Sequence, residues 1–147
     1  MKLSKLTKDF EKDCKLLRNK LRDYNISQVG TYSKSEPIFL CYKNEKNELI
    51  AGLYAYQSLG VFYIDLLWVD DSYRNQGLGA KLLNQAEEYA KTHGALNVRV
   101  NTASFQSVGF YLKHAYKILA RVPLSIDGHK EQYDYYLIKA VKNTKNM

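Results

Sequence analysis

The chain has 147 residues, of which 46% are apolar and 25% are charged. This composition is typical of globular proteins and argues against disordered and membrane-spanning classes. No apolar run approaches the ~20 residues of a membrane span and no signal-peptide core follows Met1, so we expect one cytoplasmic domain over residues 1–147.

The charge balance favours an anionic partner. Lysine and arginine number 22 against 15 aspartate and glutamate, which gives a net charge of +7. Phosphorylated small molecules and nucleic acids both fit such a balance. Because the basic residues are spread along the chain, a dedicated nucleic-acid surface is not expected. Cys14 and Cys41 lack CxxC spacing and lie far from the histidines, so the sequence predicts neither a metal site nor a disulfide framework.

The first part of the chain reads as one helix followed by strands. Apolar residues at helical spacing predict an amphipathic helix from Leu6 to Tyr24, with Thr7 as its N-cap. Asn25 to Glu36 are polar and contain Gly30, so we expect a loop there. Runs rich in β-branched and aromatic residues then predict three antiparallel strands, at 37–42, 49–57 and 61–69.

The third of these strands contains an acidic residue. Strict alternation would place Tyr63, Asp65 and Leu67 on one face, and Ile64, Leu66 and Trp68 on the other. Asp65 would then lie in an apolar strand, where burial raises a carboxyl pKa and suits a general base. A carboxylate satisfied by backbone donors or by a tyrosine hydroxyl is the alternative, and both interpretations stay open.

A polar turn, Arg74-Asn75-Gln76-Gly77-Leu78-Gly79, separates this strand from a helix of residues 78–92. Free N–H groups at a helix start bind anions, the glycines let a diphosphate approach the backbone, and Arg74 adds a guanidinium. Glycines that serve only a tight turn are the alternative. Leu82 stands where a dinucleotide fingerprint needs a third glycine, and Ala80-Lys81 does not match a P-loop.

The remaining chain predicts a strand, a short helix and a hairpin. Gly94 suits the position after the helix end. A strand is expected at 97–102, a helix within 104–116, and two strands at 116–122 and 133–141 joined through Asp127-Gly128. Residues 142–147 are expected to fray.

These motifs resemble the GNAT superfamily of acetyl-coenzyme A dependent N-acetyltransferases. The resemblance rests on Arg74, Gly77 and Gly79 between strand and helix, with Tyr111 and Tyr116 downstream. It is strongest from Leu66 to Tyr116. In the downstream motif Ser104 and Ser107 replace the family's Asn and Ala, and Ala115 replaces its Gly, which puts the local turn in doubt. The Phe105-Gln106 and Phe110-Tyr111 pairs resemble a bacterial subgroup with largely unassigned acceptors.

The resemblance implies an α/β fold of the GNAT acyl-CoA N-acyltransferase type. Its sheet is mixed and mostly antiparallel, with helices on both sides. The fourth and fifth strands, here 61–69 and 97–102, are parallel and splay apart to admit the pantetheine arm. Too few residues precede the first helix for a full first strand, so that strand is short or missing.

The resemblance also implies direct transfer of an acetyl group from acetyl-coenzyme A to the primary amine of a small molecule. A backbone N–H near Leu67 to Val69 would polarise the acetyl carbonyl, and Tyr111 would protonate the leaving thiolate unless it is only a packed aromatic. Asp65 or a water chain would serve as base. The implied coenzyme-binding residues are Leu67, Trp68, Val69, Arg74, Asn75, Gln76, Gly77, Leu78, Gly79, Ala80, Asn101, Ser104 and Ser107.

Other functions remain open at this point. Protein or peptide acetylation and a non-catalytic acyl-CoA-binding sensor are the alternatives. The acceptor itself is not specified, although the loop from Asn25 to Glu36 and the side chains of His129, Tyr133 and Tyr135 are expected near it. Tyrosine-rich terminal strands are compatible with a homodimer.

Overall fold

The computed structural model describes residues 1–5, 8–32, 36–129 and 131–141. Contacts divide the chain into two compact units, Met1–Lys34 and Ser35–Met147, which are described separately. The expectation of one domain over 1–147 stays a prediction. The expected N-cap at Thr7 and the expected frayed end at 142–147 lie outside the described residues.

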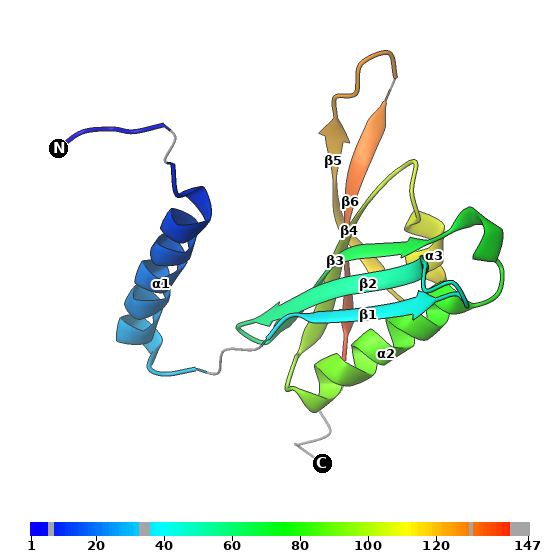
Figure 1. Ribbon diagram of the computed structural model, residues 1–147, viewed down its shortest axis with the longest axis horizontal. Helices are drawn as coiled ribbons and strands as arrows, with labels where there is room; N and C mark the ends of the chain where they lie inside the picture. Colours follow the sequence, from blue (N-terminus) through cyan, green and yellow to red (C-terminus); the bar gives the residue numbers. More distant parts are fainter. Residues whose placement is uncertain (6–7, 33–35, 130, 142–147) are drawn as a thin grey trace. The chain divides into compact units, whose positions relative to one another are not determined.

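The first unit contains helix α1, Phe10–Val29 (Figure 1). The prediction of a loop from Asn25 was wrong for residues 25–29, which are helical. No glycine or proline interrupts the helix before Gly30, which adopts a left-handed φ of 82° and donates its N–H to Ile26 O at 2.8 Å. No strand precedes α1 among residues 1–5 and 8–9.

The second unit is built on one six-stranded sheet (Figure 1). The strands are β1 (Ile38–Lys43), β2 (Leu49–Ser58), β3 (Val61–Val69), β4 (Asn97–Ala103), β5 (Lys117–Leu124) and β6 (Gln132–Ala140). Their order across the sheet is β1-β2-β3-β4-β6-β5. The expected antiparallel run of the first three strands is confirmed, as is the hairpin of β5 and β6.

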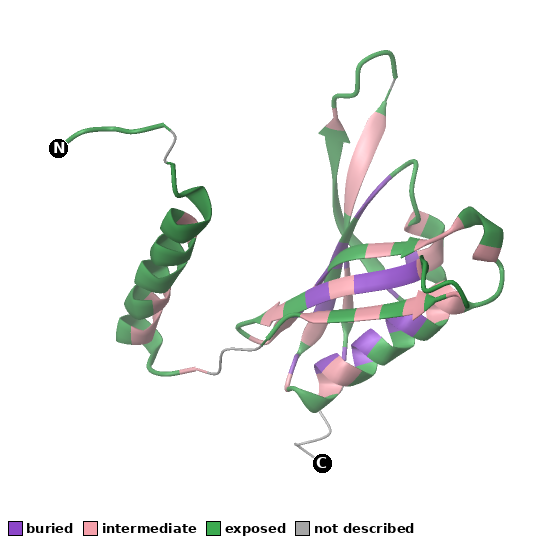
Figure 2. Cartoon of the chain, viewed as in Figure 1, coloured by how far each residue is buried: buried purple, intermediate pink, exposed green. Residues whose placement is uncertain are grey.

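Helix α2, Leu78–Thr92, packs on one face of this sheet against β1 to β4 (Figure 1). Its inward face carries Leu83, Ala86 and Ala90, all with 0% exposure. Phe62 of β3 and Leu53 of β2 are also fully buried, and Figure 2 shows the buried segments concentrated on α2 and the central strands. Full burial of a leucine or phenylalanine side chain contributes about 1.5–3 kcal/mol to the free energy of folding, so this layer is the main core.

The two α-helices described in the second unit, α2 and α3, end in the same hydrogen-bonded turn. After α2, Gly94 has φ 78°, and the N–H of Ala95 donates to Ala90 O at 2.9 Å. After helix α3, Val108–Lys113, Ala115 has φ 67° and the N–H of Tyr116 donates to Tyr111 O at 3.1 Å. This is the Schellman arrangement, and it forms even where alanine replaces glycine.

Helix α3 is shorter than the segment 104–116 in which it was expected. Side chains hold the preceding residues in a turn instead, because Gln106 Oε1 accepts the Ala103 N–H at 2.8 Å and Thr102 Oγ1 accepts the Ser107 N–H at 3.1 Å. These bonds fix the path from β4 into α3.

Strands β3 and β4 are parallel, as expected, and they separate part of the way along. Their register runs from Val61 opposite Asn97 to Ile64 opposite Val100 and stops there. Beyond this point β3 continues to Val69 on β2, while β4 continues to Ala103 on β6. The sheet therefore opens between the two strands over their last residues.

A β-bulge at Asp65 lies where this opening begins. In the register of β2 with β3, Tyr54 pairs with Leu66 and Ala55 with Ile64, so Asp65 is the extra residue. The expected alternation was therefore wrong beyond Ile64. Ile64 is 4% exposed but Leu66 is 62% exposed, and Leu67 packs against the core instead.

Candidate active site

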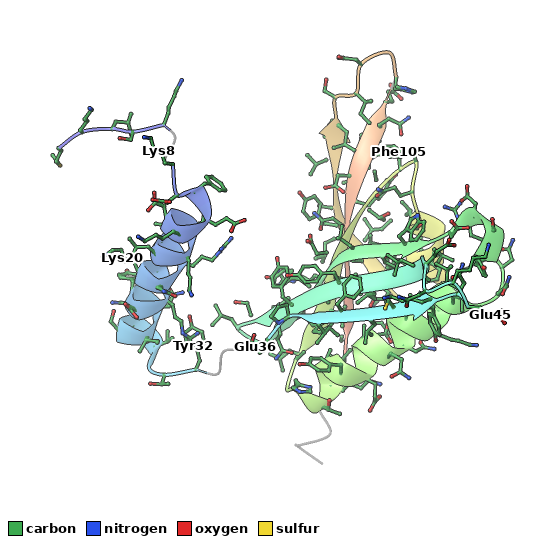
Figure 3. All side chains as sticks on the ribbon, in the orientation of Figure 1. Lys8, Lys20, Tyr32, Glu36, Glu45 and Phe105 are labelled. Carbon is green, nitrogen blue, oxygen red and sulfur yellow. The ribbon has the colours of Figure 1, made fainter. Side chains whose placement is uncertain are left out.

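The opening between β3 and β4 forms a cavity of ≈ 630 Å³. Its walls come from the two strands, the start of α2 and the start of α3. Phe105, which is labelled in Figure 3, adds to the lining from the turn between β4 and α3. The predicted coenzyme-binding residues that line it are Leu67, Trp68, Val69, Arg74, Asn75, Gly77, Leu78, Gly79, Ala80, Asn101 and Ser107. Two strand-to-helix segments, β3 to α2 and β4 to α3, thus meet around one space.

The start of α2 presents unpaired amides to this cavity. Gly77 is the N-cap residue, with φ 77°, and no side chain caps the helix. The first hydrogen bond of the helix runs from the N–H of Lys81 to Gly77 O, at 3.0 Å. The amides of Leu78 to Ala80 precede this bond, so they have no acceptor within the helix. The helix also has no acidic residue in its first turn, so its positive end is free to attract an anion.

The two glycines of the motif have different surroundings. A side chain at Gly79 would place its Cβ 3.5 Å from the Phe110 ring and 3.7 Å from Val69 Cγ2, which are ordinary van der Waals contacts, so a Cβ would fit at this position. A Cβ at Gly77 would have no protein atom within 4 Å. Gly77 is needed for its left-handed backbone, which agrees with the tight-turn interpretation, and it leaves open space at the helix end.

Arg74 is held at the rim of the cavity. Its Nη2 lies 2.8 Å from Asp71 Oδ1 in an exposed ion pair, and its Nε donates to Val69 O at 3.3 Å. These contacts orient the guanidinium without burying it, so its remaining donors are available to an anion.

Tyr111 of α3 lines the same cavity and is 4% exposed. Its ring packs edge-on against Tyr116, with centroids 5.4 Å apart. Its hydroxyl has no hydrogen-bond partner in the described part of the chain. Burial raises the pKa of the phenol, so the group stays protonated at neutral pH. Tyr111 is therefore a packed aromatic that lines the cavity, and its role as a proton donor stays a prediction.

Asp65 does not have the environment expected from the sequence. The bulge turns it out of the core and leaves it exposed, so the burial on which its proposed tuning depended is absent. Its carboxylate makes no hydrogen bond or ion pair with other described residues. Asp65 nevertheless lines the cavity, beside Asn101 of β4.

A second cavity of ≈ 370 Å³ adjoins the first. The two share Ile64, Asp65, Val100 and Asn101, the residues at which β3 and β4 part. The other walls of the second cavity are Tyr56, Tyr63, Arg99 and Tyr136. Sequence reasoning missed all four.

Register explains which tyrosines reach the second cavity. Tyr136 is opposite Asn101 in the pairing of β4 with β6, whereas Tyr135 is opposite Thr102 and faces the core. Tyr133 is covered by the Arg121 guanidinium, 4.3 Å from its ring centroid. Tyr133, Tyr135 and His129 do not line this cavity, and their expected position near the acceptor stays a prediction.

Two of the predicted coenzyme contacts do not line the first cavity. Gln76 is not among its lining residues, and neither is Ser104. Ser104 Oγ donates to Gln132 Oε1 at 2.5 Å and accepts the Tyr133 N–H at 3.0 Å, so it ties the turn to β6. In contrast, Tyr73 and Gln106 line the cavity and were not predicted.

Two negative findings apply to the part of the chain that the structure describes. No group of three or more histidine, cysteine, aspartate or glutamate side chains is placed to hold a metal ion. No helix is long and apolar enough to cross a membrane.

The sequence matches the Acetyltransferase (GNAT) family over residues 4–116, and the chain belongs to this family. It is 30% identical over 112 residues to an acetyltransferase of Agrobacterium fabrum, covering 76% of this chain and 81% of that protein. It is 38% identical over 80 residues to blasticidin-S acetyltransferase of Streptomyces morookaense, a match that covers 54% of this chain and only 59% of that relative.

Solved structures agree with this assignment. A Bacillus cereus acetyltransferase superposes with a TM-score of 0.77 at 29% identity, covering 96% of this chain and 98% of that one. A Bacillus anthracis structure in complex with acetyl-coenzyme A gives a TM-score of 0.63 at 22% identity, covering 75% of this chain and 65% of that one. The expected fold and the expected class of enzyme, an acetyl-coenzyme A dependent acyltransferase, are confirmed.

Proposed function

We propose that this chain moves an acetyl group from acetyl-coenzyme A directly to the primary amine of a small molecule. The observation that carries the proposal is the meeting of two cavities at Asp65 and Asn101, where the β3–β4 pairing ends. One cavity has an anion-binding helix end and the other has an aromatic wall. An amine bound in the second can therefore reach a thioester bound in the first.

The first cavity suits coenzyme A in three respects. The amides of Gly77 to Ala80 and the guanidinium of Arg74 would hold the diphosphate. The unpaired edge of β3 from Leu67 to Val69 offers backbone groups to the pantetheine arm and an N–H to the acetyl carbonyl. Open space at Gly77 leaves room for phosphate oxygens. Acetyl-coenzyme A would supply an activated acetyl thioester.

The second cavity favours a small acceptor over a protein. Its volume of ≈ 370 Å³ falls within the range of small-molecule pockets, and strands β2, β3, β4 and β6 supply its lining residues. The relative from Streptomyces morookaense is named for blasticidin-S, which supports an acceptor of this kind. Peptide acetylation is the runner-up and would need a longer open groove.

Two proton movements complete the proposed reaction. An amine with a pKa near 10.4 is neutral in only about one molecule in a few thousand at pH 7, so its proton must be removed. Asp65 at the junction, directly or through water, would accept it. Tyr111, whose phenol is protonated at neutral pH and whose pKa is raised further by burial, would donate a proton to the departing sulfur.

Binding is the first test. Titration with acetyl-coenzyme A by calorimetry should give a micromolar-range Kd. Gly77→Glu should weaken binding by about tenfold more than Gly77→Gln, since the two variants share the backbone strain and differ in the charge set against the diphosphate. Equal affinities for both variants would contradict a diphosphate at this helix end.

Turnover separates the proposal from its alternatives. Release of free thiol in the presence of a panel of small primary amines, blasticidin-S among them, is expected. Tight coenzyme binding without turnover of any amine or peptide would instead indicate an acyl-CoA-binding sensor, and turnover confined to peptides would indicate the runner-up. A cytoplasmic location and a homodimer stay predictions, and no dedicated nucleic-acid surface is expected.

A further inference from the structure

The second cavity contains a positive charge without a carboxylate partner. Arg99 of β4 donates through Nε to Asn97 Oδ1 at 3.3 Å, and its guanidinium lies 6.0 Å from the centroid of the Tyr63 ring. No aspartate or glutamate within residues 36–129 and 131–141 forms an ion pair with it. The terminal nitrogens are therefore available to an anion from outside the chain.

Aromatic rings form the wall beside this charge. Tyr56 and Tyr63 are opposite each other on β2 and β3, and their rings stack with centroids 5.2 Å apart and planes 21° apart. Tyr136 of β6 lines the same cavity. Desolvation, followed by the negative charge of Asp65, raises the pKa of Tyr56 above its ordinary value. Such a wall suits a flat, apolar body.

The charged groups occupy different rows of the sheet. Arg99 is opposite Tyr63, whereas Asp65 and Asn101 each come two residues later on the same two strands. Two residues of a strand span about 6.6 Å, so the attachment points of the anionic and cationic groups are separated by roughly the length of a six-membered ring with its substituent. This spacing of the attachment points favours an acceptor whose amine and acidic group are further apart than in an α-amino acid.

We propose that the acceptor is a zwitterion with a flat body, in which a primary amine lies at Asp65 and an acidic group, such as a carboxylate, binds Arg99. This proposal rests on the proposed function and specifies its substrate. The tyrosines would stack on the flat part, Arg99 would bind the acid, and the amine would then be directed through the junction of the two cavities.

Three related primary amines test the charge and the shape separately. The probes are 4-(aminomethyl)benzoate, benzylamine without the acid, and 4-(aminomethyl)cyclohexanecarboxylate with a puckered ring. We expect kcat/KM for the benzoate to exceed that for benzylamine by about tenfold, because Arg99 is partly screened by water. It should exceed that for the cyclohexane acid by about three- to tenfold, since stacking is weakened.

Variants of Arg99 test whether this side chain causes the preference for the benzoate over benzylamine. Arg99→Met keeps an unbranched stem and removes the charge, and should bring the benzoate-to-benzylamine ratio of kcat/KM close to one. Arg99→Lys should restore part of the ratio. The matched control is Arg121→Met, because Arg121 lies over Tyr133 and outside the cavity, and it should leave the ratio as it is.

The outcomes distinguish this inference from the proposed function. The proposal of an acidic acceptor is wrong if the unaltered enzyme acetylates benzylamine with the same kcat/KM as the benzoate, or if Arg99→Met keeps the benzoate-to-benzylamine ratio. In either case the proposed acetylation of small amines stands. Turnover of other amines in the panel without turnover of the benzoate has the same meaning. Absence of free thiol with every amine would overturn both.

Discussion

Lys139 Nζ lies 2.8 Å from Glu87 Oε2, which links β6 to α2. The same ammonium lies 3.0 Å from Glu87 Oε1, and the Tyr116 hydroxyl donates to that oxygen at 3.1 Å. Glu87 is only 6% exposed, so its charge is tolerated because both partners are present. The helix, the end of α3 and the last strand are thus held by one carboxylate.

Glu87→Ala should destabilise the fold by about 2–4 kcal/mol, because it leaves the half-buried ammonium and the buried hydroxyl without their partner. Glu88→Ala is the matched control, since that exposed neighbour has only a 3.7 Å ion pair with Lys91 and should cost less than about 0.5 kcal/mol. Urea unfolding of both variants measures the difference. Equal midpoints would show that the Glu87 contacts contribute nothing beyond surface charge.

Stability should fall above pH 10. Burial first, then the charge of Glu87, raises the pKa of Tyr116 above its ordinary value of 10.0, and burial does the same for Tyr111. Because the folded chain holds these protons more tightly than the unfolded one, their contribution is complete below pH 10 and is lost as the pH rises beyond it. Urea midpoints from pH 8 to 11 should fall less steeply in the Tyr111→Phe/Tyr116→Phe double variant.

Tyr111→Phe should lower kcat by about 100-fold while the affinity for acetyl-coenzyme A changes little, because the substitution removes a proton donor and keeps the ring. Tyr89→Phe is the control. Tyr89 stacks on His93 at the opposite end of α2, so losing its hydroxyl should leave kcat as it is. Full turnover in Tyr111→Phe would end the leaving-group role and leave Tyr111 as a packing residue.

Asp65→Asn should lower kcat/KM for amines, since a neutral amide does not take up the proton that the attacking amine loses. The exposed position at the bulge predicts little effect on stability, within about 0.5 kcal/mol. A rate and pH profile identical to those of the unaltered chain would assign the base to water.

Ala115→Gly should stabilise the chain by about 0.5–1 kcal/mol. Alanine at φ 67° carries a left-handed strain of about 1–2 kcal/mol, which glycine avoids at a smaller entropic cost. Gly94→Ala, at the equivalent position after α2, should have the opposite effect and cost about 1 kcal/mol. Shifts of the thermal midpoint in the same direction for both would contradict this account.

Much of the fold could be predicted because its signals are local. The strand, the glycine turn and the amphipathic helix from Val61 to Gly94 lie where the sequence placed them, and the turn at Gly94 follows from one residue. Tyr111 and the start of α2 were found for the same reason, since they lie in contiguous motifs. Short-range chemistry determined these features.

The second cavity could not be predicted because it depends on register between distant strands. The bulge at Asp65 changes which side chains of β3 face the core, and no local pattern signals it. Arg99 and Tyr136 become neighbours of Tyr56 only through the pairing of β4 with β3 and β6. In the sequence, each of these residues is one position of a predicted strand, with nothing to mark it as part of a binding site.

The place of β6 between β4 and β5 has a consequence for synthesis of the chain. It is the last strand in sequence, yet it is hydrogen-bonded on both sides. Until residue 140 has been made, β4 has an open edge and β5 has no neighbour in this sheet. The nascent chain must therefore carry an unfinished sheet until β6 has been made, and an exposed edge is open to wrong pairing during that time.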